Sequence, residues 1–452
     1  MSYRTMEQGV LFKGLSKRVV VAKFDQDHAS SDGGALLLKA CDQQLGLSGK
    51  LAACVNDDRQ PSKVQHSLAE MFRQRMFGLA CGYEDANDAA RLGDDPIHKL
   101  LVDRDPIDGQ RLASQPTLSR FENQVSAREL LRMAQALAET VIARHKRRKK
   151  RVKRITIDLD PTEDRTHGAQ QLSLFNAFYD TACYLPMAGF LSFDEEPEQY
   201  LFCYVLRAGN ATAKQGCLSI LRLLLPRLRR AFPRARIRIR LDAGFTGAAM
   251  YTFFETNKLE YVVCMATNSV LKTLAAPLLD ELRDAAPGVR YAAANYQAGA
   301  WQRARRVIIK ATITYHPDRA PKDNPRFIVT NLKGSPKRIY EQVYCRRGDA
   351  ENRIKELKGG LQVDRTSCHR FLANQFRALM TSAAYVLMQE LRLRARGTSC
   401  GKAQVATLRL RLIKIGAWVE SSSRRIVIHL PVSMPYMYEW RRIAKAIGAI
   451  PT

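Results

Sequence analysis

The sequence predicts an α/β fold: a domain of strands and helices, interrupted by an inserted β-rich domain and preceded by a mainly helical N-terminal domain. Helix-like spacing of apolar residues dominates the first 143 residues. Beyond them, "RITIDLDPT" and "RIRIRLDAGF" alternate apolar and polar residues as half-buried strands do, and each reaches an aspartate near its end. Between residues 266 and 338, β-forming runs such as "RRVIIKATITY" indicate the insertion.

The N-terminal domain is predicted over residues 1–143 of the 452. A strand-like "RVVVAKF" comes first, and apolar residues then recur at three and four in "KVQHSLAEMFRQRMFGLACGYED" and "SARELLRMAQALAETVIARHK". The segment "QPTLSRFEN" opens with helix-starting residues and is either part of a DNA-reading helical unit or an ordinary packing helix. The run "RHKRRKKRVKR", with nine bases in eleven residues, marks the domain boundary, either as a solvated linker or as a phosphate contact.

The α/β domain is predicted in two parts, residues 144–265 and 339–395, with 266–338 inserted between them and 396–452 as a basic C-terminal region. Its elements follow the order of three strands, helix, strand, helix and strand, and after the interruption a further helix. This is the element order of a ribonuclease H-like fold.

The net charge predicts an anionic partner. Lys and Arg number 72 against 44 Asp and Glu, which gives +28, and nucleic acid is the leading candidate for so basic a chain. A membrane is disfavoured because the sequence has no apolar run of about 18 residues and no signal-peptide core at its N-terminus. We therefore expect a cytoplasmic protein. The ten cysteines include no Cys-x-x-Cys pair, so reduced thiols are expected rather than zinc ligands.

Three acids stand out by their positions: Asp160 and Asp242 at strand ends, and Glu351 on the later helix. Sites in open α/β sheets form at strand ends. Clustered carboxylates raise one another's pKa unless a cation offsets them, and Mg²⁺ prefers such oxygen ligands. The sequence therefore predicts a metal site. Asp158 shares the face of Asp160, and periodicity alone does not choose between them.

The helix around Glu351 has one basic face. If "YCRRGDAENRIKELK" is a regular α-helix, then Tyr344, Arg347, Glu351 and Lys358 lie within about 60° of one another, whereas Asp349 and Glu356 lie on the far side. We expect Glu351 to complete the metal site, with Arg347 and Lys358 holding phosphates and the Tyr344 hydroxyl bracing them. The pair Gly359-Gly360 predicts the end of the helix.

The spacing Tyr-x2-Arg-x3-Glu-x6-Lys resembles the signature of the Tyr-Arg-Glu-Lys branch of the DDE transposases of bacterial insertion sequences. The chain is similar to the thirteen-eighty group of that branch over most of its length, through the segments "SSDGGALLLKA", "GYEDANDAARL", "QPTLSRFEN", "TIDLDPTEDRTHGAQQ", "RLDAGF" and "DRTSCHRFLANQFR". One departure is "LDAGF" where "ADSGF" is expected, which removes a serine hydroxyl but keeps the aspartate.

The resemblance implies a ribonuclease H-like catalytic domain with a β-insertion, which uses two divalent metals. Asp160, Asp242 and Glu351 would be both the catalytic residues and the metal ligands, with Mg²⁺ as the cofactor and Mn²⁺ as a substitute. The N-terminal domain would bind DNA and dimerise, and the C-terminal region would add DNA or dimer contacts. The implied partners are double-stranded DNA, as inverted-repeat ends and as target, and a second copy in a homodimer on that DNA.

Further DNA contacts are expected from four residues. In relatives with such an insertion an aromatic residue can stack on a flipped base, and Trp301, beside Arg305 and Arg306, is the candidate, with burial in the insertion's core as the alternative. His167, with Asn176 nearby in sequence, would orient the site or the DNA, unless it is a structural histidine.

The implied activity is that of a DNA transposase, acting at the nucleoid of a bacterium. It would cut insertion-sequence ends and join their 3′-hydroxyls to target DNA by two-metal phosphoryl transfer. The alternative is a nuclease of the same fold, or a DNA-binding protein that does not transpose.

Overall fold

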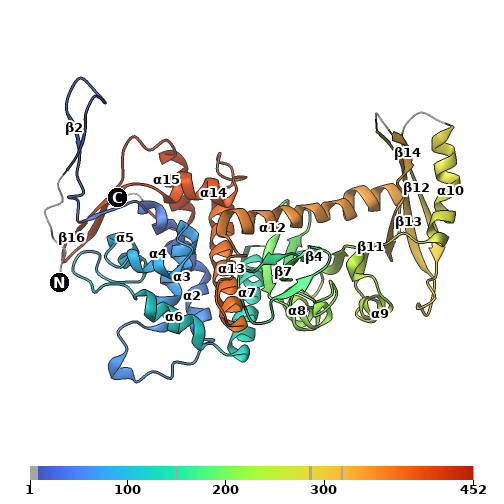
Figure 1. The fold of residues 1–452 in the computed structure, drawn as a ribbon, viewed down its shortest axis with the longest axis horizontal. Coiled ribbons are helices and arrows are strands. Elements are labelled where there is room, and N and C mark those ends of the chain that lie inside the picture. The colour runs from blue at the N-terminus through green and yellow to red at the C-terminus, as the bar shows by residue number, and fades with distance from the viewer. Residues whose placement is uncertain (1–8, 149–150, 285–287, 317–318, 451–452) are drawn as a thin grey trace.

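The computed structural model describes residues 9–148, 151–284, 288–316 and 319–450. Residues 1–8 of the predicted N-terminal domain, and Lys149 and Lys150 of the basic run, lie outside the described residues. The N-terminal helices and the C-terminal elements gather at one end of an elongated molecule, and the insertion forms the other end (Figure 1).

The N-terminal domain is mainly helical, as the sequence predicts. A hairpin of β1 (Val10–Phe12) and β2 (Val20–Ala22) precedes β3 (Ala29–Ser30). The main helices that follow are α1 (Leu36–Leu45), α2 (Leu47–Ala52), α3 (Leu68–Cys81), α4 (Ala86–Arg91), α5 (Pro96–Leu101), α6 (Gln115–Gln124) and α7 (Ala127–Arg148). Helix α3 begins with a capping box, in which Ser67 and Glu70 each accept a backbone N–H from the other.

A nine-stranded mixed sheet forms the centre of the molecule, in the order β12-β13-β15-β11-β10-β4-β8-β9, with β14 paired to β13. Strands β10 and β11 run parallel to β4, whereas β8 is antiparallel to it. The strands are β4 (Arg154–Pro161), β8 (Met187–Phe193), β9 (Tyr200–Val205), β10 (Arg236–Leu241), β11 (Glu260–Met265), β12 (Val289–Tyr296), β13 (Arg305–His316), β14 (Arg319–Asp323) and β15 (Arg326–Thr330).

The insertion continues this sheet instead of forming a sheet of its own. Strand β15 pairs antiparallel with β11, and β13 and β12 follow outward. A helix that the sequence analysis did not predict, α10 (Ser269–Arg283), packs on β12 and β13. Strands β12 to β15 and helix α10 therefore make up most of residues 266–338, and these strands share a hydrogen-bonded ladder with those of the main sheet.

Long helices join the N-terminal domain to the sheet. Helix α13 (Phe371–Arg394) is buried along most of its length and contacts α3, α7 and β9. Helices α8 (Cys217–Ala231) and α9 (Ala248–Thr256) complete the layers, and a small sheet of β5 (Asp164–Arg165), β7 (Thr181–Tyr184) and β6 (Leu174–Asn176) follows β4.

The helix that carries Glu351 is not regular. Short α11 (Pro336–Arg338) leads into a π-helical turn at Ile339–Tyr344 and a 3₁₀ turn at Cys345–Arg347, and α12 proper spans Gly348–Leu361. The assumption of a single regular helix from Tyr344 to Lys358 is therefore wrong. The predicted stop at Gly359-Gly360 is also wrong, because α12 runs through both glycines and ends where Gln362 adopts φ 49°.

The C-terminal region returns to the N-terminal domain through α14 (Val405–Leu408), β16 (Ala417–Ser421), β17 (Ile426–His429) and α15 (Met437–Ala446). Strand β16 pairs with β3, so residues from both ends of the chain form one small sheet. Among the described residues, the search for a membrane-crossing helix finds none of sufficient length and apolar character.

Candidate functional site

Asp160 and Asp242 lie next to each other because of strand register. Strand β4 carries Asp160 near its end, and β10 runs parallel to it with Arg240 opposite Asp158. Two residues further along each strand, the same register brings Asp242 beside Asp160. Asp242 caps the following 3₁₀ turn, where its Oδ1 accepts the Gly244 N–H at 2.9 Å. Neighbouring parallel strands thus present two carboxylates at one edge of the sheet.

Arg347 links Glu351 to Asp160. Its guanidinium donates to Oδ2 of Asp160 at 3.1 Å and, through its other terminal nitrogen, to Oε1 of Glu351. Glu351 lies in the first turn of α12, one turn after Arg347, so the two side chains share a face. The arginine predicted to hold phosphate therefore neutralises two of the three acids in this structure.

The three acids influence one another electrostatically. Burial raises the pKa of Asp160 to about 7, Arg347 opposes that rise, and the charges of Asp242 and Glu351 add to it. Burial also raises the pKa of Asp242, against the effects of Arg347 and the Gly244 N–H, and Glu351 again adds to the rise. Burial disfavours the charged form of Arg347, but Asp160 and Glu351 outweigh it and raise its pKa. The site therefore has an excess of negative charge when all three acids ionise.

Asp158, the other candidate for the first acid, is fully engaged elsewhere. Both of its oxygens accept from Arg240 at 2.7 Å, and the side chain is 1% exposed. The charge of Asp158 is therefore already paired within the sheet, whereas the electrostatic partners of Asp160 include Asp242 and Glu351. The geometry favours Asp160 for the site. The alternation of "RIRIRL" could have indicated Arg240, because it places that residue on the polar face of β10.

The donor set fits hard divalent cations. It consists of carboxylate oxygens, which Mg²⁺ prefers. The pKa values of Asp160 and Asp242 are raised first by burial and then by neighbouring acids, as expected of buried, grouped acids without enough positive charge. In the described part of the chain, the one trio of ligand atoms lying within 4.8 Å of one another belongs to a different cluster. Asp160, Asp242 and Glu351 are therefore not arranged around a single ion position while Arg347 lies between two of them.

Lys358 and His167, both predicted DNA contacts, line one pocket of about 380 Å³. The Lys358 ammonium donates to the Glu163 carbonyl and lies 3.7 Å from Asp364, and His167 is exposed. Arg165, Arg365 and Gln170 also line the pocket. Asn176, in contrast, is structural: it donates to the Gly209 carbonyl at 2.7 Å and accepts the Phe178 N–H at 3.0 Å.

Tyr344 lies where the π-helical turn meets the 3₁₀ turn that leads into α12. It ends the π-helical turn, is half-buried, and packs on Tyr340 with 5.4 Å between ring centroids. Burial and the nearby Cys264 raise its phenol pKa. Tyr344 and Arg347 lie close enough for each to affect the pKa of the other, and the phosphate contact by the Tyr344 hydroxyl stays a prediction.

Trp301 and Arg305 are buried, and for Trp301 the structure shows the stated alternative, burial in the insertion's core. Trp301 is 5% exposed and meets Tyr251 and Tyr296 edge to face. Arg305 lies over the Trp301 ring and pairs with both oxygens of Glu255, at 2.9 and 3.0 Å. A base could stack on Trp301 only after this packing was broken. The guanidinium of Arg306 is also engaged within the chain, since it donates to the carbonyls of Leu332 and Gly334.

An ionic contact between the N-terminal domain and the segment after α12 was not predicted from the sequence. Asp85, which precedes α4, accepts from Arg377 of α13 at 3.1 Å and also from Arg365. Arg365 contacts Glu84 as well, at 3.1 Å. These residues lie in "GYEDANDAARL" and "DRTSCHRFLANQFR", Arg365 and Arg377 are 280 and 292 positions from Asp85, and no local periodicity links them. The contact fixes one wall of the pocket that holds Lys358.

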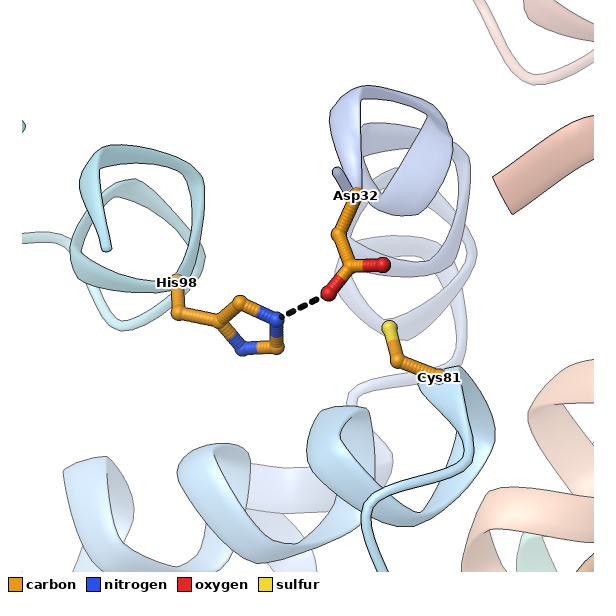
Figure 2. Close-up of side chains that lie close together, drawn as sticks. All are labelled: Asp32, Cys81 and His98. Carbon is orange, nitrogen blue, oxygen red and sulfur yellow. Dashed lines mark hydrogen bonds and ion pairs between the residues drawn. The ribbon is translucent and has the colours of Figure 1, made fainter. Parts of the chain in front are cut away.

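Figure 2 shows the trio whose ligand atoms lie within 4.8 Å: Asp32, Cys81 and His98, all buried. Asp32 accepts from His98 Nε2 at 2.9 Å and pairs with Lys414 at 2.8 Å. Burial acts to raise the Asp32 pKa, but His98 and Lys414 outweigh it and lower it. Burial raises the thiol pKa of Cys81, so the thiol stays protonated. Because the aspartate charge is already matched, we interpret this cluster as a structural link between the N-terminal domain and Lys414.

Residues 12–452 match the family described as transposase DDE domain group 1. No curated protein matches the chain significantly. Among solved structures, the chain resembles the piggyBac transposase in a synaptic complex with hairpin DNA, with 10% identity and a TM-score of 0.41, over 93% of this chain and 82% of that one.

Proposed function

Because the chain belongs to the transposase DDE domain group 1 family, we propose that it is a DNA transposase that cuts the ends of a bacterial insertion sequence and joins their 3′-hydroxyls to target DNA. Its double-stranded DNA partners are the inverted-repeat ends and the target, and it works as a homodimer that holds two ends together. The net charge of +28 supports a polyanionic partner.

The observation that carries this proposal is the convergence of Asp160, Asp242 and Glu351. Two come from adjacent strand ends and the third from a helix that begins more than 100 residues later, and their charges act on one another and on Arg347. The strand order β9-β8-β4-β10-β11, with β8 antiparallel, supports a ribonuclease H-like catalytic domain.

Asp160, Asp242 and Glu351 would hold Mg²⁺, with Mn²⁺ as a substitute. A pair of such ions activates a water or a 3′-hydroxyl and stabilises the leaving oxygen of a phosphodiester. The chain's own groups have complementary tasks. Asp158 and Arg240 fix the end of β4, the Gly244 N–H orients Asp242, and Arg347, once freed from the acids, is placed to bind a DNA phosphate through its planar fork.

The test is a strand-transfer assay with paired transposon ends, a target plasmid and Mg²⁺. Asp160→Asn, Asp242→Asn and Glu351→Gln should each lower the cleavage rate by at least about a hundredfold while DNA binding persists. Asp349→Asn is the matched control, because this acid lies in the same first turn of α12 but lines a different pocket. Equal residual cleavage in all four variants would refute the assignment.

The same assay separates a transposase from a nuclease of the same fold. A transposase yields joined products in which transposon 3′ ends are covalently linked to the plasmid, whereas a nuclease stops at cut ends. Cleavage that depends on the three acids but never gives joined products would therefore leave the catalytic site intact and overturn the transposition proposal.

A further inference from the structure

Helix α6, which carries the segment "QPTLSRFEN", has one face whose residues are explained by packing. Leu118, Phe121 and Glu122 are buried. The Phe121 ring meets those of Phe72 in α3 and Phe376 in α13 edge to face, with 5.0 Å between the centroids of each pair. These contacts fix α6 on the body of the N-terminal domain, and they do not involve its other face.

The other face of α6 lines a polar pocket of about 220 Å³, which we call the α6 pocket. Thr117, Arg120 and Gln124 are spaced at three and four positions, so they share this face, and Arg120 and Gln124 are exposed. Most of the remaining lining comes from residues 59–66. Figure 1 shows α6 toward the end of the molecule that holds the N-terminus, far from α10 of the insertion.

The α6 pocket has an excess of positive charge. Of the described side chains that line it, Arg59, Lys63 and Arg120 are basic and none is acidic. Arg59 pairs with Asp57 at 2.6 Å, whereas Lys63 and Arg120 form no ion pair within the described part of the chain. The pocket that holds Lys358, in contrast, is also lined by two acids. The α6 pocket therefore suits an anionic ligand.

The segment opposite α6 is held in place by other arginines. Arg104 donates to the Gln65 carbonyl at 3.0 Å and to Nδ1 of His66 at 2.9 Å, and Arg59 donates to the His66 carbonyl at 2.9 Å. Burial and the charge of Arg104 lower the pKa of His66. Because a guanidinium only donates, Nδ1 of the neutral ring accepts and Nε2 carries the proton. Both walls of the pocket are therefore organised before a ligand binds.

Hydrogen bonds connect α6 to the wall of the Lys358 pocket. Arg370, in the segment after α12, donates to the Asn123 carbonyl of α6. The neighbouring His369 accepts the Gln171 N–H at its carbonyl at 3.0 Å, and residues 163–170 and 362–367 line the Lys358 pocket. A duplex that lies over this pocket, beside the three acids, can therefore continue toward α6.

We propose that the α6 pocket binds a backbone phosphate of the transposon-end duplex, inward from the 3′ end at the three acids. Lys63 and Arg120 supply the positive charge, and the Thr117 hydroxyl and the His66 ring N–H supply further hydrogen bonds. The inference rests on the proposed function, because it places a contact on the same DNA. It is measured by binding alone.

A phosphate fits this lining better than the edge of a base does. The ammonium of Lys63, the guanidinium of Arg120 and the His66 Nε2–H are all donors, and a phosphate oxygen is a charged acceptor. A base edge in the major groove presents acceptors together with donors or a methyl group. We therefore expect the contact to strengthen binding to any duplex without selecting its sequence.

The test is fluorescence anisotropy with a transposon-end duplex and a mixed-sequence duplex, in EDTA so that no strand is cut. Lys63→Ala and Arg120→Ala should each weaken binding to both duplexes about tenfold at low salt, and each should make binding less dependent on salt by about one released counterion. Arg120→Lys should restore the salt dependence. Lys272→Ala is the matched control, because it removes the same charge from an exposed residue of α10.

Shortening the transposon-end duplex from its inner end locates the contact. Once the duplex no longer reaches the α6 pocket, wild type and Arg120→Ala should bind it equally, and a difference that persists on the shortest bound duplex overturns the placement along the DNA. Circular dichroism checks that each variant folds.

Two outcomes overturn the phosphate site itself. One is wild-type affinity and salt dependence in both alanine variants. The other is a loss restricted to the transposon-end sequence, which would make Arg120 a base contact. If the expected losses appear but the wild type with Mg²⁺ never cuts the transposon end, the proposed catalytic function fails while the phosphate site stands.

Discussion

Asp160 is a carboxylic acid held where its charge is costly. It is buried, it lies beside two other acids, and its pKa is raised to about 7 although Arg347 donates to it. If residue 160 served only fold stability, an asparagine would stabilise the protein more, because a buried amide carries no charge. The arrangement is instead the one expected where acids are retained to bind cations.

The raised pKa predicts how stability depends on pH. Between pH 4 and 7 the folded protein holds a proton on Asp160 that the unfolded chain has lost, so this contribution to stability falls as pH rises through that window, by at most about 4 kcal/mol. Asp160→Asn should remove this decline. Urea unfolding at pH 5 and pH 8 measures it, with Asp349→Asn as the control. Parallel pH profiles for wild type and Asp160→Asn would contradict the prediction.

Helix α12 carries two glutamates that have different roles. Glu351 is partly exposed at the candidate site, whereas Glu356 is buried and accepts hydrogen bonds from Arg392, Arg353, Tyr385 and the Val405 N–H. Burial acts to raise the pKa of Glu356, but Arg392 and Arg353 outweigh it, so the pKa is lowered. Glu356 therefore joins α12 to α13 and to the start of α14.

Glu356→Gln should destabilise the fold, because it removes the charge at the centre of a buried ionic network and leaves Arg392 with Glu198 as its remaining carboxylate partner. We expect a loss of about 3 to 5 kcal/mol in the free energy of unfolding at pH 7. Glu351→Gln should lower it by far less while abolishing cleavage. Denaturant unfolding of the two variants side by side measures this, and equal losses in both would contradict the division of roles.

The elements that could be predicted from the sequence are those in which the local residue period determines the structure. The strands around Asp160 and Asp242 follow from strict alternation, and the face shared by Arg347 and Glu351 follows from a helical turn. The assumption of one regular helix from Tyr344 to Lys358 was wrong, because irregular turns such as the one where Tyr344 packs on Tyr340 depend on tertiary packing and not on the local pattern. The link between Asp85 and Arg377, 292 positions apart, is set by tertiary packing alone.

At the scale of the whole molecule, the charge of +28 predicts DNA binding that weakens steeply with salt. Lys358 lines a pocket beside the candidate site, so Lys358→Ala should reduce the slope of log affinity against log salt concentration by about 1. Lys358→Arg, which keeps the charge, should preserve the slope. Fluorescence anisotropy with one transposon end across a salt series measures it, and an unchanged slope for the alanine variant would exclude a phosphate contact.

The pairing of β15 with β11 has a practical consequence for anyone who wishes to shorten this protein. Deleting residues 266–338 would strip β11 of its neighbour and leave a row of unsatisfied amides and carbonyls next to the strand that leads to Asp242. An exposed edge of this kind can pair with strands of other chains. The shortened protein should therefore aggregate unless the edge is covered by a replacement strand or blocked by a proline or a lysine.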